Sequence, residues 1–136
     1  MPGVVDPHVH IDDMFSFDTY ETATSAAALG GTTTYIDFAW QPWVGDLSVF
    51  DKEGTLLEGI QWKKDKADGA IVDYSLHMAI TREEEETFEE LEDVVAEGIT
   101  SFKLFTAYEF GLGNGFMNEA FKSIADVGGA AVLHTE

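Results

Sequence analysis

The amino-acid sequence predicts an α/β fold built on a parallel sheet, and it favours a barrel. Apolar segments rich in β-branched and aromatic residues alternate with helical patterns, which is typical of consecutive βα units. The strand segments are almost continuously apolar, as in a sheet covered on both faces, and this fits either a barrel or a doubly wound sheet. Histidines, a lysine and an aspartate fall at or near the carboxyl ends of the predicted strands. Because that end is the catalytic end of α/β barrels, the barrel is the favoured fold.

Apolar runs and chain-breaking residues set the expected elements in the first half of the chain. An alanine-rich stretch without breakers favours a first helix, which Gly30 and Gly31 end. The next run is β-branched and aromatic, which favours a buried strand that ends near Asp37. Asp51 is suited to cap a second helix. The elements expected are a strand over 4–10, a loop over 12–18, a helix over 19–29, a strand over 32–38, a loop over 39–49 and a helix over 51–66.

Glycines separate the elements expected in the second half. Gly69 ends the second helix, and Thr81 is suited to cap a third helix, whose glutamates gather in the first turn, where the helix dipole favours them. The acidic run 83–86 is interpreted as a solvated face rather than a metal site. The elements expected are a strand over 70–80, a helix over 83–97, a strand over 99–105, a mobile loop over 107–115, a helix over 116–127 and a strand over 130–134.

Composition limits the class of protein. The chain has 136 residues, 45% of them hydrophobic, which suits one ordinary domain. Neither a basic, apolar leader nor an apolar run of about 18 residues is present, so we expect a soluble, cytoplasmic protein without a membrane partner. Cysteine is absent, so any metal site must use nitrogen and oxygen ligands.

The charge balance is strongly acidic, with 26 Asp and Glu against 7 Lys and Arg and a formal net charge of -19. This charge argues against nucleic acid and anionic membranes as partners, because both would be repelled. Two interpretations stay open: adaptation to high salt, where repulsion between carboxylates is screened, and an acidic protein of ordinary cytoplasm.

His8 and His10 lie two residues apart at the end of the first predicted strand. In a strand such residues point to the same face, so the two imidazoles form the start of a divalent metal site. The alternative is a strand edge with two solvated histidines. His134 adds a third imidazole at the end of the last predicted strand, although a single histidine there is as often a core residue as a ligand.

Lys103 interrupts an apolar strand. Burying an ammonium group is costly unless the group is paired or chemically altered. Either the side chain reaches solvent, or its neutral amine combines with carbon dioxide to give a carbamate, whose two oxygens can bridge two metal ions. With His8, His10 and His134, such a carbamate makes most of a binuclear site, in which ions about 3.5 to 4 Å apart hold a bridging hydroxide.

Several segments together resemble the amidohydrolase superfamily and, within it, the dihydropyrimidinase and D-hydantoinase family. The resemblance extends along the whole chain in the family's order and is carried by residues 2–10, 30–33, 73–77, 98–103, 107–108 and 134–136. It implies a TIM-type (β/α)8 barrel of metal-dependent hydrolases, of which 1–136 would form a fragment with about the first five strands.

The resemblance also implies roles for individual residues. His8 and His10 would bind the first zinc ion, Lys103 would be the carboxylated bridge, and His134 would bind the second zinc ion. Tyr108 would donate a hydrogen bond to the oxyanion of the tetrahedral intermediate, unless it only packs in its loop. The substrate would be a small cyclic amide, a dihydropyrimidine or a 5-substituted hydantoin, opened to an N-carbamoyl amino acid.

Other residues and functions are left open by the resemblance. Phe15 and Phe17 could form a hydrophobic wall for substrate, with packing an equal alternative for Phe15. Asp37 is expected to support the site or the fold, and His77 is either a site residue or a satisfied core histidine. Allantoinase and dihydroorotase share the histidine pair, but the stretch after His10 favours the hydantoinase side. A relative without activity that serves in assembly is the remaining alternative.

The chain also departs from the family pattern at both ends. The family continues with another metal-binding histidine and an aspartate general base, and it has a β-sandwich segment ahead of the first strand, which would place Met1 inside a longer chain. A partial barrel has unpaired sheet edges, so we expect residues 1–136 alone to be marginally folded and inactive. Family members are commonly tetramers, and we expect a homotetramer for the full-length protein.

The net charge leads to a test of salt adaptation. If the protein is adapted to high salt, molar KCl raises its melting temperature, because screening weakens repulsion between surface carboxylates. Thermal unfolding at rising KCl concentrations measures this. A melting temperature that stays level or falls points to an ordinary acidic protein instead.

Overall fold

The computed structural model describes residues 2–136, so Met1 and its expected place inside a longer chain lie outside the described residues. Strands and helices alternate along the chain, as the sequence predicts. The strands are β1 (Val4–Asp6), β2 (Thr32–Trp40), β3 (Asp73–Ala79), β4 (Ser101–Phe105) and β5 (Ala130–His134). The helices are α1 (Tyr20–Gly30), α2 (Leu56–Lys66), α3 (Glu86–Glu89), α4 (Leu91–Ala96) and α5 (Asn114–Asp126), with a 3₁₀ turn at Ala67–Gly69.

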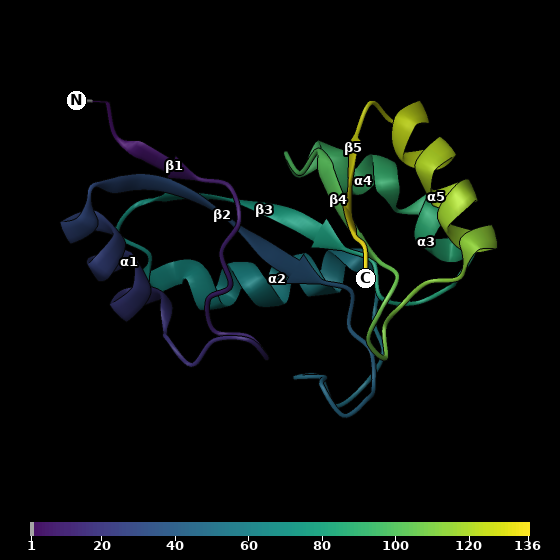
Figure 1. Cartoon of the computed structure of the whole chain (residues 1–136), viewed down its shortest axis with the longest axis horizontal. Coiled ribbons are helices and arrows are strands. Elements are labelled where there is room, and N and C mark those ends of the chain that lie inside the picture. The colour runs from purple at the N-terminus through teal and green to yellow at the C-terminus, as the bar shows by residue number, and fades with distance from the viewer. Residues whose placement is uncertain (1) are drawn as a thin grey trace.

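The five strands form one parallel sheet in the order β1-β2-β3-β4-β5. Each strand therefore pairs with the next strand along the chain. A doubly wound sheet reverses its strand order at a switch point, so this order selects the barrel type and gives a curled half-barrel. Figure 1 shows α1 and α2 along one flank of the sheet and α3 to α5 beside β4 and β5. Among the described residues, no helix is long and apolar enough to cross a membrane.

Side chains on the two faces of the sheet pack into separate cores. On the helix-covered face, apolar side chains of β3 and β4 pack against α2, α4 and α5. On the opposite face, aromatic side chains of β2 and β4 pack with the loops that follow the strands. The first core includes Leu56, Ile60, Leu76, Met78, Leu91, Phe102, Leu104 and Ile124, and the second contains Phe38, Trp40, Trp43, Ala79, Phe105 and Phe110.

Two predicted strand ends are wrong, and both bear on the site. β1 ends at Asp6, so His8 and His10 lie in the extended loop that follows it, where the Val9 N–H still donates to the Ile36 carbonyl. β2 continues to Trp40, because its last three residues are apolar, fully buried and paired with β3. Asp37 therefore lies inside the strand rather than at its end.

The predicted start of the second helix is also wrong. α2 begins at Leu56, after Thr55, and not at Asp51. The Thr55 hydroxyl accepts from the Glu58 N–H at 3.1 Å, and the Glu58 carboxylate accepts from the Thr55 N–H at 2.9 Å. This reciprocal capping box satisfies two N–H groups at once, which the Asp51 side chain could not do from four residues earlier.

The predicted third helix is divided, and its predicted cap is wrong. Glu90 separates α3 from α4, with its carboxylate turned away to accept from the Leu56 and Leu57 N–H groups at the start of α2. Thr81 is buried and its hydroxyl and N–H bond Gln41, so it caps no helix. The other bounds shift by at most three residues, and β5 matches its prediction.

Candidate active site

A cavity of about 270 Å³ opens at the carboxyl end of the half-barrel. Six of the seven residues proposed from the sequence as metal ligands, catalytic or substrate-binding groups line it, and Phe17 does not. They come from the loops after β1 and β4, from β4 itself and from the end of β5, so the fold brings together residues up to 126 positions apart. The lining residues are His8, His10, Phe15, Phe38, Lys103, Phe105, Tyr108 and His134.

The rings of His8 and His10 lie side by side on Phe38. Their centroids are 5.4 Å apart, and the Phe38 ring lies 4.8 Å from His8 and 4.7 Å from His10. Burial, followed by the neighbouring His10 and Lys103 charges, lowers the pKa of His8. The neutral imidazole, which has a free lone pair for a metal ion, is thus the favoured form.

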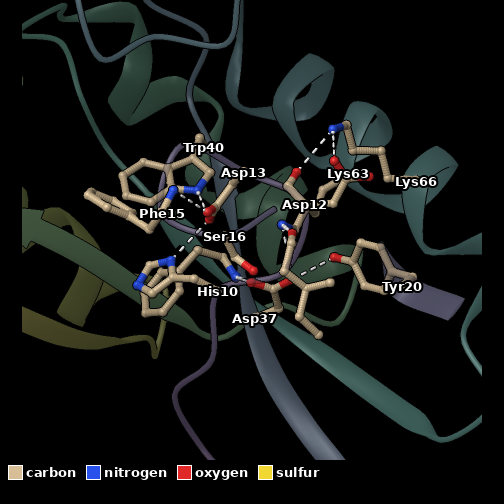
Figure 2. A network of polar contacts seen from close by, with 12 residues as sticks. His10, Asp12, Asp13, Phe15, Ser16, Tyr20, Asp37, Trp40, Lys63 and Lys66 are labelled. Carbon is tan, nitrogen blue, oxygen red and sulfur yellow. Dashed lines mark hydrogen bonds and ion pairs between the residues drawn. The ribbon is translucent and has the colours of Figure 1, made fainter. Parts of the chain in front are cut away.

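Asp13 fixes the orientation of His10. Its buried carboxylate accepts from the Phe15 N–H at 2.9 Å and from the Trp40 indole at 3.2 Å, and its Oδ2 lies 3.0 Å from His10 Nδ1 (Figure 2). Burial raises the pKa of Asp13, but the hydrogen bonds with His10 and the Phe15 N–H, together with the charge of Lys63, outweigh it and hold the pKa below its usual value. An ionised carboxylate only accepts, so His10 donates through Nδ1 and keeps Nε2 free for a ligand.

Lys103 is 5% exposed and faces aromatic rings. Its Nζ lies 5.3 Å from the centre of the Phe105 ring and 6.0 Å from that of Phe38. Burial lowers the pKa of Lys103. The side chain therefore does not extend into solvent, and burial raises the fraction of its amine that is neutral.

Tyr108 and His134 form the opposite wall of the cavity. Their ring centroids are 5.4 Å apart, and Tyr108 has a backbone φ of 68°, which is rare for a bulky residue. The adjacent Glu109 holds this turn, because its carboxylate accepts from the Trp43 indole at 2.9 Å and from two backbone N–H groups of the β2–α2 loop. These bonds lower the pKa of Glu109. The predicted loop is thus tied to the β2–α2 segment.

His77 is a satisfied core histidine that supports the site. Its Nε2 donates to the Pro7 carbonyl at 2.9 Å, and its Nδ1 accepts from the Ser101 hydroxyl at 2.6 Å. It therefore links β3 to the residue just before His8. Phe15 is 47% exposed and packs 5.0 Å from the His10 ring, whereas Phe17 is fully exposed and does not line the cavity.

A second group of possible metal ligands lies just behind the cavity. His10, Asp13 and Asp37 each offer an atom, and these atoms lie within 4.8 Å of one another. However, Asp37 Oδ2 already pairs with Lys63 Nζ at 3.0 Å. Since an ammonium group already lies beside this carboxylate, the nitrogen groups of the cavity are the better match for added metal ions.

The side chains that line the cavity could bind divalent metal ions if an anionic ligand were added to them. Three imidazoles converge with a lysine amine, and none of the residues lining the cavity is acidic. Neutral imidazoles alone do not balance two divalent cations, so a binuclear site here needs an anion. A carbamate on Lys103 would supply that charge and two oxygen ligands.

Comparisons with known proteins agree on one group of enzymes. No protein-family model matches the sequence. The chain is 40% identical to a D-hydantoinase of Streptomyces coelicolor over 143 aligned positions, covering 100% of this chain and 29% of that protein. It is 34% identical to a dihydropyrimidinase of Arabidopsis thaliana, covering 100% of this chain and 25% of the relative.

Solved structures of the same group of enzymes have a similar fold. The crystal structure of dihydropyrimidinase from Brevibacillus agri superposes with a TM-score of 0.86 at 31% identity, covering 100% of this chain and 29% of the other. A D-hydantoinase structure gives a TM-score of 0.85 at 32% identity. The chain thus spans less than a third of the length of these relatives.

The contacts of Asp13 lead to a prediction about metal binding. Replacing Asp13→Asn removes the charge that holds His10 Nδ1 as a donor, so zinc affinity should fall by about 10- to 100-fold, as is usual when such a partner is lost. Competition with a chromophoric chelator measures this in the full-length protein. The control is Asp18→Asn, which changes an exposed carboxylate of the same loop. Equal zinc affinity in the Asp13 variant and the control would contradict this role.

Proposed function

This chain is homologous to the D-hydantoinases and dihydropyrimidinases, and we propose that it forms the part of a cyclic amidohydrolase that carries most of the metal centre. The proposed reaction is hydrolysis of a ring amide, in a dihydropyrimidine or a 5-substituted hydantoin, to an N-carbamoyl amino acid. The observation that carries the proposal is the convergence of His8, His10, Lys103 and His134 on one cavity.

The proposed metal ligands divide into two groups. His8 and His10 would hold one divalent ion, most simply Zn²⁺, and His134 would hold the second, with Lys103 between them as a carbamate. When bound, such a pair of ions lowers the pKa of water and polarises the carbonyl that is attacked. His77 and Asp13 support this arrangement, because they fix the chain before His8 and the donor nitrogen of His10.

Lys103 is suited to take up carbon dioxide. Its neutral amine would attack the carbon of CO₂, forming an N–C bond and releasing one proton, which leaves a carbamate anion. Burial supports this step, since it lowers the pKa of the amine and so raises its unprotonated fraction. The anion then offsets part of the charge of the two ions in a cavity lined by apolar rings.

The remaining lining residues would bind and orient the substrate. The Tyr108 hydroxyl would donate to the oxygen that becomes negative as the ring amide is attacked. Phe15, Phe38 and Phe105 offer apolar surfaces for a flat ring and its substituent. A homotetrameric assembly and a cytoplasmic location complete the proposal and rest on the resemblance to the family.

The first test combines metal content with turnover in the full-length protein. We expect about two zinc ions per chain and hydrolysis of dihydrouracil and phenylhydantoin. Lys103→Ala should lose bound zinc and activity together, because the bridging anion is gone. Lys122→Ala, which removes an exposed lysine paired with Glu119, is the control. If the unmodified protein holds no metal and turns over neither substrate, the relative without activity becomes the better interpretation.

The second test separates oxyanion stabilisation from metal binding. Tyr108→Phe removes only the hydroxyl, so kcat should fall by about 10²- to 10³-fold while zinc content stays at the level of the unmodified protein. Steady-state kinetics with elemental analysis measures both quantities. Tyr74→Phe, a partly exposed tyrosine outside the cavity, should leave kcat unchanged. An undiminished kcat in Tyr108→Phe would assign this residue to packing alone.

A further inference from the structure

The turn that follows His10 has a strained backbone. Asp12 has a φ of 52°, in the left-handed region that most residues other than glycine avoid. The turn reverses the chain between His10 and Asp13 so that the Asp13 carboxylate reaches back to the imidazole at 3.0 Å. Strain of this kind persists only where the surroundings hold it in place.

Two lysines of α2 hold the turn from the helix side. Lys63 Nζ donates to the Ile11 carbonyl, and Lys66 Nζ donates to the Asp12 carbonyl at 3.0 Å and to Asp12 Oδ1 at 2.7 Å. Residues three apart on a helix share a face, so both ammonium groups reach the same turn. Figure 2 shows them approaching it from the side opposite His10.

Lys63 is the more unusual of the two because its side chain is fully buried. Its charge is balanced by Asp37, whose Oδ2 lies 3.0 Å from Nζ, and the same carboxylate accepts from the Tyr20 hydroxyl at 2.6 Å and the Phe38 N–H at 2.7 Å. A buried ion pair is commonly no more stabilising than a well-packed apolar pair. Stability alone therefore does not account for a buried cation that also binds the Ile11 carbonyl.

We propose that Lys63 and Lys66 are positioning residues for His10, which they hold in the metal cavity through the carbonyl groups of Ile11 and Asp12. Asp37 balances the buried charge of Lys63, and neither lysine is among the residues that line the cavity. This inference rests on the proposed function, because it assigns the two lysines to the geometry of that metal centre.

The experiment measures zinc affinity of the metal-free full-length protein by competition with a chromophoric chelator. The main variant is Lys63→Met with Asp37→Asn, which removes both buried charges and keeps an acceptor for the Tyr20 hydroxyl. The second variant is Lys66→Met. The Lys66 side chain is partly exposed, and its loss removes the ion-pair partner of Asp12, whose carboxylate is also partly exposed. The control is Lys64→Met, which removes an exposed cation of the same helix that pairs with Glu97.

The expected result is a loss of zinc affinity of about tenfold in the main variant, with a normal unfolding transition and with the Lys64 control unchanged. The main variant loses one positive and one negative charge, so its net charge is unchanged. In Lys66→Met the loss of a positive charge would by itself strengthen cation binding, so weaker binding in that variant indicates lost positioning. The visible spectrum of bound Co²⁺, which reports ligand geometry, should change in the main variant and not in the control.

Each of the other outcomes also supports or overturns the inference. Unchanged zinc affinity in a folded main variant overturns the inference and leaves the proposed function intact. If the main variant does not fold, Lys66→Met decides: about tenfold weaker binding supports the inference, and unchanged binding overturns it. If the unmodified protein binds no zinc, both the inference and the proposed function fail.

Discussion

The alternation of side chains along β2 is the constraint on which the rest of the site depends. This strand is paired on both sides, with β1 and β3, so its register is fixed and successive residues point to opposite faces. Asp37 faces α1 and α2, whereas Phe38 and Trp40 lie on the opposite face of the sheet and contact the loop that carries His10. A shift of one residue would place the Asp37 carboxylate under His8 and His10 and would place the aromatic rings of Phe38 and Trp40 among the helices.

The lysine side chains near the site are also divided between the two faces of the sheet. Of the seven Lys and Arg side chains, Lys63 and Lys66 hold the histidine turn from behind and Lys103 lies in the cavity. The outward surface of this acidic protein offers carboxylates in excess, yet none lines the cavity beside the histidines. The carbamate proposed for Lys103 would supply an anion at this place without a carboxylate from another segment.

The sequence was sufficient for the barrel class and for most of the residues that meet in the cavity, because both follow from where unusual residues fall along the apolar runs. Strand ends carry the active residues in parallel barrels, and His8, His10, Lys103 and His134 each interrupt or end an apolar run. The cap of α2 could also have been found, since Thr55 and Glu58 form a visible capping pattern. The supporting roles of Asp13, His77 and Lys63 could not be predicted from the sequence. Their bonds to Trp40, Pro7 and Ile11 join positions that are far apart in the chain.

The backbone strain shows how these distant contacts shape the cavity. Among residues 2–136, the two residues other than glycine with positive φ are Asp12, which lies two residues after the cavity-lining His10, and Tyr108, which itself lines the cavity. Each such conformation costs on the order of 1 to 3 kcal/mol, so neither would persist without external support. Lys66 holds the first turn, and Glu109, bonded to Trp43 and the loop after it, holds the second. Lys66 and the groups that bond Glu109 all lie in the segment between β2 and the end of α2. No residue of that segment lines the cavity, yet its bonds hold the two turns that position His10 and Tyr108 in it.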